Sequence, residues 1–484
     1  MIDKNNHLKN KELSLGIALL PILILVLLLS YNVLIYGDDA LGGSNQFILL
    51  LGAAVAGIVG FYYKIGYQFM IDKVAENLQS VTGALLILLF VGALAGTWLL
   101  SGIIPAMIYY GLQILHPSIF LPACIIICAI ISLATGSSWT TSATVGIALI
   151  GIGKVLGIPV GMVAGAVISG AYFGDKLSPL SDTTNLAPAM AGGELFSHIR
   201  YMTHTTVPSI VVTIIVFLIL SLTQSTSGAA DTETLMLAIK EKFTITPWLF
   251  IVPGVVIVLI IKKAPPLIAL LIGTLLGGFF ALLFQSSILL EVTEASVLSF
   301  EVGYRAIMNS MTVSTEITTT NTLLNDLFTS GGMEGMLGTI WLIICAMVFG
   351  GIMDAIGALE RISAALLSWA QTTFQLFAST VASCLAINLT ASDQYLSIVI
   401  PGKMFANAYK ERKLAPENLS RTLEDSGTVT SVLIPWNTCG AYQSGVLGVG
   451  VGEYFIYAIF NWLSPFMTLL FAAFNIKIKA LKTN

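Results

Sequence analysis

Long apolar runs, separated by short polar stretches, make up most of this 484-residue chain. Many of the runs reach the roughly 20 residues that a helix needs to cross the hydrocarbon layer of a membrane. The first run, residues 13–36, is longer than the apolar part of a signal peptide and is followed by no small-residue cleavage site. We therefore expect an uncleaved first span, and the whole pattern predicts an all-α polytopic membrane protein.

Four polar stretches interrupt the apolar pattern where a continuous helix would otherwise be expected. Two of them, residues 135–141 and 390–394, lie between apolar arms and are interpreted as the tips of re-entrant helical hairpins. The other two, residues 175–185 and 426–440, are interpreted as breaks in transmembrane helices. Prolines in or beside these breaks forbid a regular helix: Pro179, Pro188 and Pro435.

The polar stretches recur at a constant spacing of 255 positions, which predicts an internal duplication. The paired residues are Gly96 with Gly351, Thr135 with Thr390, Ser137 with Ser392, Asp182 with Asn437, and Thr183 with Thr438. The predicted organisation is a tail (1–12), a first repeat (13–223), a polar linker (224–243), a second repeat (244–475) and a tail (476–484). Within the first repeat, residues 66–80 are expected to lie on the membrane surface, and 82–112 to form one span.

The distribution of Lys and Arg predicts how the repeats are oriented, because short cytoplasmic loops are enriched in these residues. The base of the second hairpin carries Lys410, Arg412 and Lys413, whereas the base of the first carries only Lys154. The hairpins are therefore expected to enter from opposite sides, as two inverted-topology repeats. We expect a protein of the bacterial cytoplasmic membrane with both termini in the cytoplasm.

Composition narrows the function classes. Charged residues make up only 10% of the chain and apolar residues 56%, and the mean hydropathy is +0.89. No basic, aromatic-interleaved patch indicates nucleic acid, so membrane lipid is the expected surrounding. The five cysteines and four histidines lack metal-ligand spacing, and no nucleophile elbow or phosphate loop is present. We expect neither an enzyme nor a cofactor.

The broken segments place oxygen-bearing side chains beside backbone carbonyls that a break leaves free, a combination that suits Na⁺ or another small hard cation. The predicted ion-binding residues of the first repeat are Asp182, Thr183, Ser181, Asn185, Ser137, Ser138 and Thr135. Asp182, Ser138 and Thr183 are the expected direct ligands of Na⁺. Asp182 also fits a capping role for the helix that resumes near Thr184, and both roles are compatible.

A pseudo-symmetric site is expected in the second repeat, formed by Asn437, Thr438, Thr390, Ser392 and Asp393. Acidic residues inside a membrane are costly and are therefore functional candidates. For proton coupling the candidates are Asp175, Asp425, Lys176 and Asp354. The sequence leaves alternatives open: an Asp175–Lys176 pair that only holds the break together, a capping role for Asp393, and a structural role for Asp354.

The chain resembles the NhaC family of sodium/proton antiporters. The resemblance rests on "TGSSWTTSATVG" (135–146), "SGAYFGDKLSPLSDTTNLAP" (169–188), "HIRYMTHTTVP" (198–208) and "LEDSGTVTSVLIPWNTCGAY" (423–442). It implies membership of the wider ion-transporter superfamily, an elevator mechanism and a homodimer. The expected function is Na⁺/H⁺ exchange by alternating access, in which one buried carboxylate binds either ion competitively.

The resemblance leaves a second transport function open, because relatives in the family exchange malate for lactate or handle amino acids. In that case the chain is a Na⁺- or H⁺-coupled antiporter of small organic anions or amino acids, with Lys176 or Arg421 as the cationic partner. A channel and a membrane-embedded hydrolase fit the sequence less well. The two inverted halves carry one lone acid, and Ser137 and Ser138 have no histidine at comparable depth.

Overall fold

The structure is a computed structural model that describes residues 13–36, 42–114, 116–223, 232–262, 264–319 and 321–481. This part of the chain is almost entirely helical. Its one sheet is an antiparallel pair of two-residue strands, β1 (Thr315–Glu316) and β2 (Thr329–Ser330), with Thr315 opposite Ser330. Several predicted segments lie outside the described residues: the tail 1–12, the first part of the linker (224–231), and residues 482–484 of the C-terminal tail.

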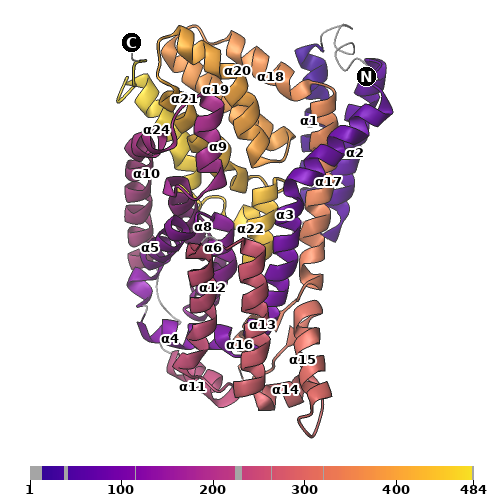
Figure 1. Cartoon of the computed structure of the whole chain (residues 1–484), viewed down its shortest axis with the longest axis vertical. Helices are drawn as coiled ribbons and strands as arrows, with labels where there is room; N and C mark the ends of the chain where they lie inside the picture. Colours follow the sequence, from indigo (N-terminus) through magenta and orange to yellow (C-terminus); the bar gives the residue numbers. More distant parts are fainter. Residues whose placement is uncertain are drawn as a thin grey trace.

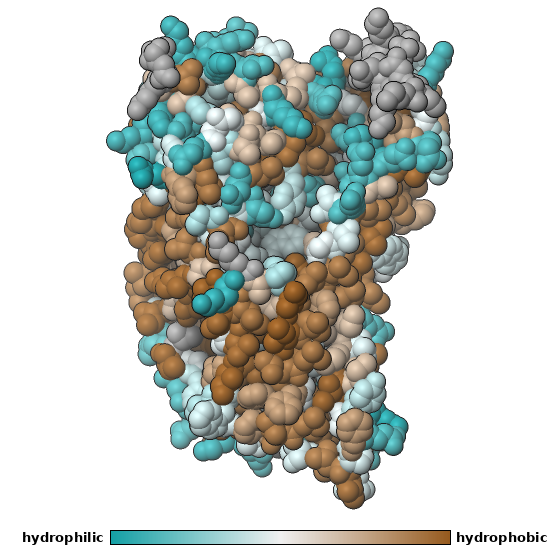
Figure 2. Space-filling view, viewed as in Figure 1, coloured by the Kyte–Doolittle hydropathy of each residue, from teal (hydrophilic) through white to brown (hydrophobic). Residues whose placement is uncertain are grey.

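Eight helices in the described ranges are long and apolar enough to cross a membrane, or nine if one bent pair counts as a single span. Figure 2 shows a hydrophobic belt around the middle of the molecule, between two polar ends. Large apolar side chains exposed on this scale indicate contact with lipid, because soluble proteins rarely expose such patches. The expected all-α polytopic membrane protein is confirmed.

The helices divide between the two predicted repeats. Those of the first are α1 (Leu15–Tyr36), α2 (Ser44–Tyr62), α3 (Tyr67–Leu100), α4 (Ile103–Ile114), α5 (Pro117–Thr135), α6 (Ser138–Thr141), η2 (Ser142–Gly146), α7 (Ile147–Val155), α8 (Val160–Leu177), α9 (Asp182–Ala191) and α10 (Leu195–Thr223). Those that follow are α11 (Thr232–Lys242), η4 (Pro247–Phe250), α12 (Ile251–Ile261), α13 (Pro266–Phe284), α14 (Ser286–Val292), α15 (Phe300–Thr312), α16 (Thr322–Leu327), η5 (Glu334–Met336), α17 (Leu337–Ala355), α18 (Ala358–Ser368), α19 (Thr373–Thr390), α20 (Gln394–Glu411), α21 (Pro416–Leu423), η6 (Glu424–Thr428), η7 (Ser431–Leu433), α22 (Thr438–Leu447), α23 (Val451–Tyr454) and α24 (Ile459–Ala473).

Two groups of long helices flank a centre made of broken ones (Figure 1). The long helices α3 and α17 pack side by side on one flank, with α2 beside α17 and α1 beside α2, and α10 and α24 pack on the other. Helices α8, α9 and α22 lie between the two flanks. The helix breaks are therefore in the middle of the molecule, away from both polar ends.

Corresponding helices of the two halves recur at the spacing that the sequence predicts. Helices α4 and α18 begin 255 positions apart, at Ile103 and Ala358, and α9 and α22 begin 256 apart, at Asp182 and Thr438. This shared register agrees with a duplication. The inverted orientation of the repeats and the re-entrant course of the hairpins stay predictions.

The expected limits of the segments 66–80 and 82–112 are wrong. Residues 66–80 do not form a separate surface helix, because α3 continues without interruption from Tyr67 to Leu100. The same helix ends before Gly102, which has a φ of +77°, so it does not extend to residue 112. The cause is packing: Gly351 on α17 has no Cβ, so the backbone of α3 can pass close by at Val74. Part of the predicted linker is also structured, since it contains α11.

Candidate ion-binding site

The first helix break is held open by polar side chains that replace the missing helical hydrogen bonds. Helix α8 ends at Leu177, and α9 begins at Asp182. The Thr184 hydroxyl donates to the carbonyl oxygens of Asp175 (3.3 Å) and Lys176 (3.1 Å). The Asn185 amide donates to the carbonyls of Pro179 (2.9 Å) and Ser181 (2.6 Å). The "SPLSDTTN" stretch therefore supplies its own partners, as a break away from bulk water must.

The second break is tied to the tip of the second hairpin. Asn437 caps α22 by accepting from the Cys439 amide (3.1 Å) and donates to the Asn388 carbonyl (3.1 Å). The Thr438 amide donates to the Ser392 carbonyl (2.9 Å). These contacts hold the end of α19 against the start of α22, so hairpin and break form one rigid unit.

The first hairpin tip touches the first break through a glycine. Helix α5 ends at Gly136, whose φ is +70°, and a Cβ there would lie 2.6 Å from the Leu180 Cβ. Ser137 then caps α6 by accepting from the Thr140 amide (3.1 Å). Two independent features therefore require Gly at this position: the positive φ and the close approach of the neighbouring segment.

We expect Gly136→Ala to lower thermal stability in detergent and to reduce transport, because the substitution adds both strain and a clash to the tip. The cost expected from the positive φ alone is about 1 kcal/mol. The matched control is Gly192→Ala, since Gly192 also has a positive φ, of +74°, but no atom lies within 4 Å of the place that a Cβ would take there. Equal losses in both variants would show that contact between tip and break is unimportant.

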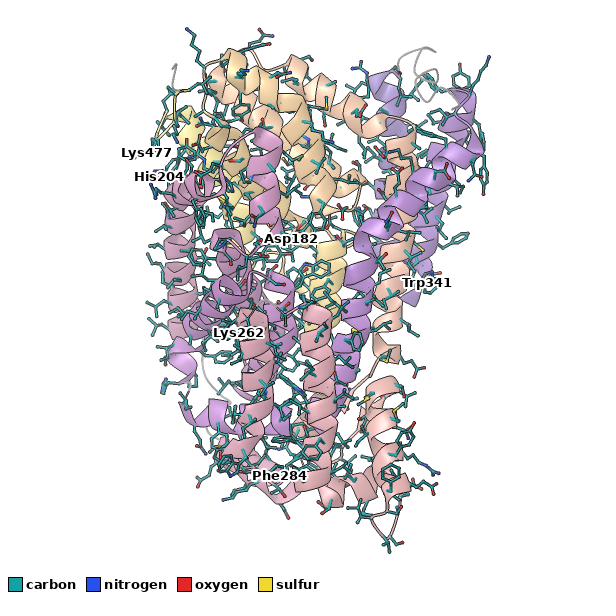
Figure 3. All side chains as sticks on the ribbon, viewed as in Figure 1. Asp182, His204, Lys262, Phe284, Trp341 and Lys477 are labelled. Atoms are coloured by element: carbon teal, nitrogen blue, oxygen red, sulfur yellow. The ribbon has the colours of Figure 1, made fainter. Side chains whose placement is uncertain are left out.

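A cavity of about 500 Å³ opens where the two hairpin tips and the two breaks meet. Figure 3 shows Asp182 near the middle of the molecule, where the face drawn in Figure 2 is hollowed. The lining includes six residues predicted from sequence: Thr135, Ser137, Asp175, Asp182, Asp393 and Thr438. The structure thus brings together candidates from both repeats that lie far apart along the chain.

Three carboxylates face this cavity in different surroundings. Asp182 is exposed to it, contrary to the expected buried acid, and accepts a hydrogen bond from the Tyr395 hydroxyl. Asp175 is buried, and its Oδ2 accepts from the Ser138 amide (3.1 Å) and hydroxyl (2.7 Å). Asp393 is buried and caps α20 through the Leu396 amide (2.9 Å).

Two of these carboxylates have one oxygen without a regular hydrogen-bond partner. Within the described ranges, Asp175 Oδ1 and Asp393 Oδ2 are buried and make no hydrogen bond of normal geometry, and the Ser181 hydroxyl lies close to the Asp175 carboxylate. Buried polar atoms nearly always have a partner, so an unpaired acidic oxygen beside a cavity points to a ligand that donates or is positively charged. The described side chains include no cluster of three His, Cys, Asp or Glu placed to hold a metal ion. A small cation here would thus combine one carboxylate with hydroxyl and carbonyl oxygens.

Other predicted site residues serve the backbone and do not line the cavity. Ser181 caps α9, Thr183 contacts the Ser181 hydroxyl (3.2 Å), and Thr390 donates to a carbonyl of its own helix (2.8 Å). Asp354, a candidate for proton coupling or a structural role, does not line the cavity. Its carboxylate lies 3.3 Å from the Lys73 ammonium, near the end of α17.

Of the two alternatives for Asp175, the structure contradicts the one in which it pairs with Lys176. Lys176 forms an ion pair with Asp425, and both side chains are completely buried. The second oxygen of Asp425 accepts from the hydroxyls of Thr205 (2.8 Å) and Thr468. Successive residues of a helix point in different directions, so Asp175 reaches the cavity while Lys176 reaches the segment that carries Asp425.

The sequence reasoning missed several residues of the cavity, notably Trp139, Gln394 and Tyr395. Trp139 stacks on Tyr442 with ring centroids 4.0 Å apart, which links the first tip to α22. The repeat itself carried a signal, because Trp139 and Gln394 are 255 positions apart and each lies at the start of the helix that follows a tip.

Broken helices that meet around a carboxylate-lined cavity, inside a polytopic helical chain, define a secondary transporter. The chain belongs to the Na⁺/H⁺ antiporter family, whose model matches residues 170–476. It is therefore a multi-pass membrane transporter and not an enzyme. The resemblance to NhaC proteins noted from the motifs is confirmed.

Three relatives cover most of the chain. The Na⁺/H⁺ antiporter NhaC of Alkalihalophilus pseudofirmus is 36% identical over 89% of this chain and 90% of its own. The malate-2H⁺/Na⁺-lactate antiporter of Bacillus subtilis is 36% identical over 87% and 86%, respectively. The arginine/ornithine antiporter ArcD of Halobacterium salinarum is 34% identical over 95% and 92%.

Proposed function

We propose that the protein exchanges Na⁺ for H⁺ across the membrane by alternating access, and that the sodium ion binds in the central cavity. The observation that carries the proposal is the pair of buried, unpaired carboxylate oxygens of Asp175 and Asp393 beside Asp182. Carboxylate, hydroxyl and carbonyl oxygens are the ligands that hard cations prefer. Membership of the Na⁺/H⁺ antiporter family supports the identity of the two ions.

Competition for one acid couples the two ions. Asp182 is the proposed primary ligand, with Ser137, Thr135 and Asp175 as neighbours in the same cavity. Either Na⁺ or a proton neutralises the carboxylate, and an uncompensated charge makes the passage of the site across the hydrocarbon layer costly. If the carrier moves only in its neutralised forms, each sodium ion carried one way is matched by proton movement the other way.

The proposed architecture follows the two predicted repeats, 13–223 and 244–475, in inverted orientation. The matched helix starts support the duplication, and the basic residues around Lys410 and Lys477 support placing that end in the cytoplasm. An elevator movement in a homodimer of the bacterial cytoplasmic membrane is part of the proposal, by resemblance to the wider superfamily.

The direct test uses the purified protein in liposomes that contain a pH-sensitive dye and are acidic inside. Sodium added outside is expected to raise the internal pH, because protons leave as sodium enters. Li⁺ and K⁺ are added in parallel to define selectivity, and protein-free liposomes give the leak. A pH response no larger than that leak, with every cation, would contradict the proposal.

Exchange of organic acids or amino acids is the second candidate, and one observation favours it: the cavity is larger than a bare cation needs. Against it, the described residues of the lining include three carboxylates and no Lys, Arg or His, and both Lys176 and Arg421 are buried elsewhere. The liposome assay is therefore repeated with malate, lactate or arginine. A sodium response that appears only with one of these compounds would decide for the second candidate.

A further inference from the structure

Glu424 is a buried acid that the cavity does not explain. It begins η6, a π-helical turn, and its side chain is completely buried. Neither carboxylate oxygen makes a hydrogen bond of normal geometry within the described part of the chain, and the nearby Thr428 hydroxyl, one turn further along, is the polar group that comes close to the carboxylate. An ionised carboxylate without a partner in a protein interior carries a desolvation penalty of several kcal/mol, so such a group is stable mainly in its protonated form. Widened π-helical turns recur at functional sites.

The charges around Glu424 do not compensate it. Those within electrostatic range are Lys176, Asp175 and Asp425. The ammonium of Lys176 already pairs with Asp425, and Asp175 adds a second negative charge. Lys176 is therefore shared among three acids, and the other buried cation nearby, Arg421, makes no hydrogen bond to Glu424 within the described ranges.

The helices packed against η6 add little positive charge near Glu424. Helix α24 carries no titratable side chain, α19 carries only Cys384, and α9 carries only Asp182, which faces the cavity. Helix α20 contributes these titratable residues: Tyr395, Lys403, Tyr409, Lys410 and Glu411. On α21, Glu417 pairs with Lys479, and Arg421 lies one turn before Glu424. On α10, buried His198 contacts the Ser420 hydroxyl (2.7 Å).

We propose that Glu424 is a proton-binding site of the exchanger, separate from the cavity that binds the cation. The inference rests on the proposed Na⁺/H⁺ exchange and changes one part of it: Asp182 binds the sodium ion, and the exchanged proton is carried by Glu424 and not by Asp182. Asp175 provides the link, because it lines the cavity and is also within electrostatic range of Glu424. With the cavity empty, the Asp175 charge opposes ionisation of Glu424. A sodium ion beside Asp175 cancels that repulsion, and Glu424 releases its proton to water.

Arg421 provides a partner for the ionised form. Its guanidinium is completely buried, 4.6 Å from the centre of the Tyr201 ring, and its three nitrogens make no hydrogen bond within the described ranges. Glu417, Arg421 and Glu424 are spaced by four and three positions, which places them along one face of a helix. This face leads from the Glu417–Lys479 pair, at the end of the molecule where Figure 3 labels Lys477, to Glu424.

The test compares two fluxes in liposomes that contain full-length Glu424→Gln. Sodium–sodium exchange is followed with radioactive sodium, and sodium-driven proton movement with a pH dye. We expect the variant to keep sodium–sodium exchange near the wild-type rate, because the cavity is intact, and to lose proton movement down to the leak. The matched control is Glu417→Gln on the same helix face, which is expected to keep both fluxes.

The other outcomes are decisive. Proton movement retained by Glu424→Gln would overturn the inference. Loss of both fluxes in a folded variant would also overturn it, because Glu424 would then be needed to carry sodium. If the Gln variant does not fold, Glu424→Asp is used, and it must shift the pH profile of proton movement without altering sodium–sodium exchange. Failure of the wild-type protein to move protons at all would instead contradict the proposed function.

Discussion

Asp182→Asn is expected to reduce sodium-driven proton movement to the leak of empty liposomes. Asparagine has nearly the same shape, and its one oxygen can still accept from the Thr183 amide, as Oδ1 of Asp182 does (2.9 Å). The substitution removes the charge and the hydrogen bond from the Tyr395 hydroxyl to Oδ2, and the rest of the cavity is unchanged, so the fold should persist. Loss of a favourable acid at the start of α9 costs only about 0.3–1 kcal/mol. The measurement is the pH-dye assay, with thermal unfolding in detergent as the check on folding.

The control for Asp182→Asn is Asp354→Asn. Asp354 is also an acid in an apolar helix, but it lies in an ion pair with Lys73 away from the cavity, and the control should exchange normally. Asp175→Asn and Asp393→Asn distinguish among the three cavity acids. Normal exchange by Asp182→Asn, together with loss in either of these two variants, would transfer the primary role to the other acid.

The positions of the breaks were predictable from sequence, for a physical reason. A helix that stops away from water must satisfy its free backbone groups with nearby side chains. Residues 175–185 therefore carry Ser, Thr and Asn together with proline, and they form the predicted break between α8 and α9. The second half obeys the same rule at Asn437, which caps α22 and binds Asn388.

The partners of the charged residues were not predictable in the same way. Asp175 and Lys176 are adjacent in sequence, and adjacency favoured a local pair, but Lys176 pairs with Asp425, 249 positions away. Such a contact depends on how the two halves pack, which hydropathy and spacing do not specify. Exposure of Asp182 is another example, because it depends on the shape of the cavity that both halves enclose.

Lys176→Met is expected to lower the free energy of unfolding strongly, because it leaves the Asp425 carboxylate buried without its cation. Breaking a buried pair from one side typically costs about 3–5 kcal/mol. The double variant Lys176→Met/Asp425→Asn should recover much of this loss, since Asn stays neutral and still accepts from Thr205 and Thr468. The free energy of unfolding is measured in detergent, by heating or by adding denaturant, for the wild-type protein, the single variant and the double variant.

Burial is what separates this pair from an ordinary ion pair, and the chain offers a direct comparison. Lys479 pairs with Glu417 at 2.5 Å, but its side chain is 38% exposed, whereas the side chains of Lys176 and Asp425 are 0% exposed. Lys479→Met should therefore cost less than Lys176→Met, because Lys479 is partly in solvent, although its partner Glu417 is only 9% exposed. If Lys176→Met were as mild as Lys479→Met, Asp425 would have to be neutral in the folded protein. The positive charge of Lys176 would then be available to stabilise an ionised Glu424. Glu424 would have no reason to hold a proton, and the proposed proton-binding site would lose its basis.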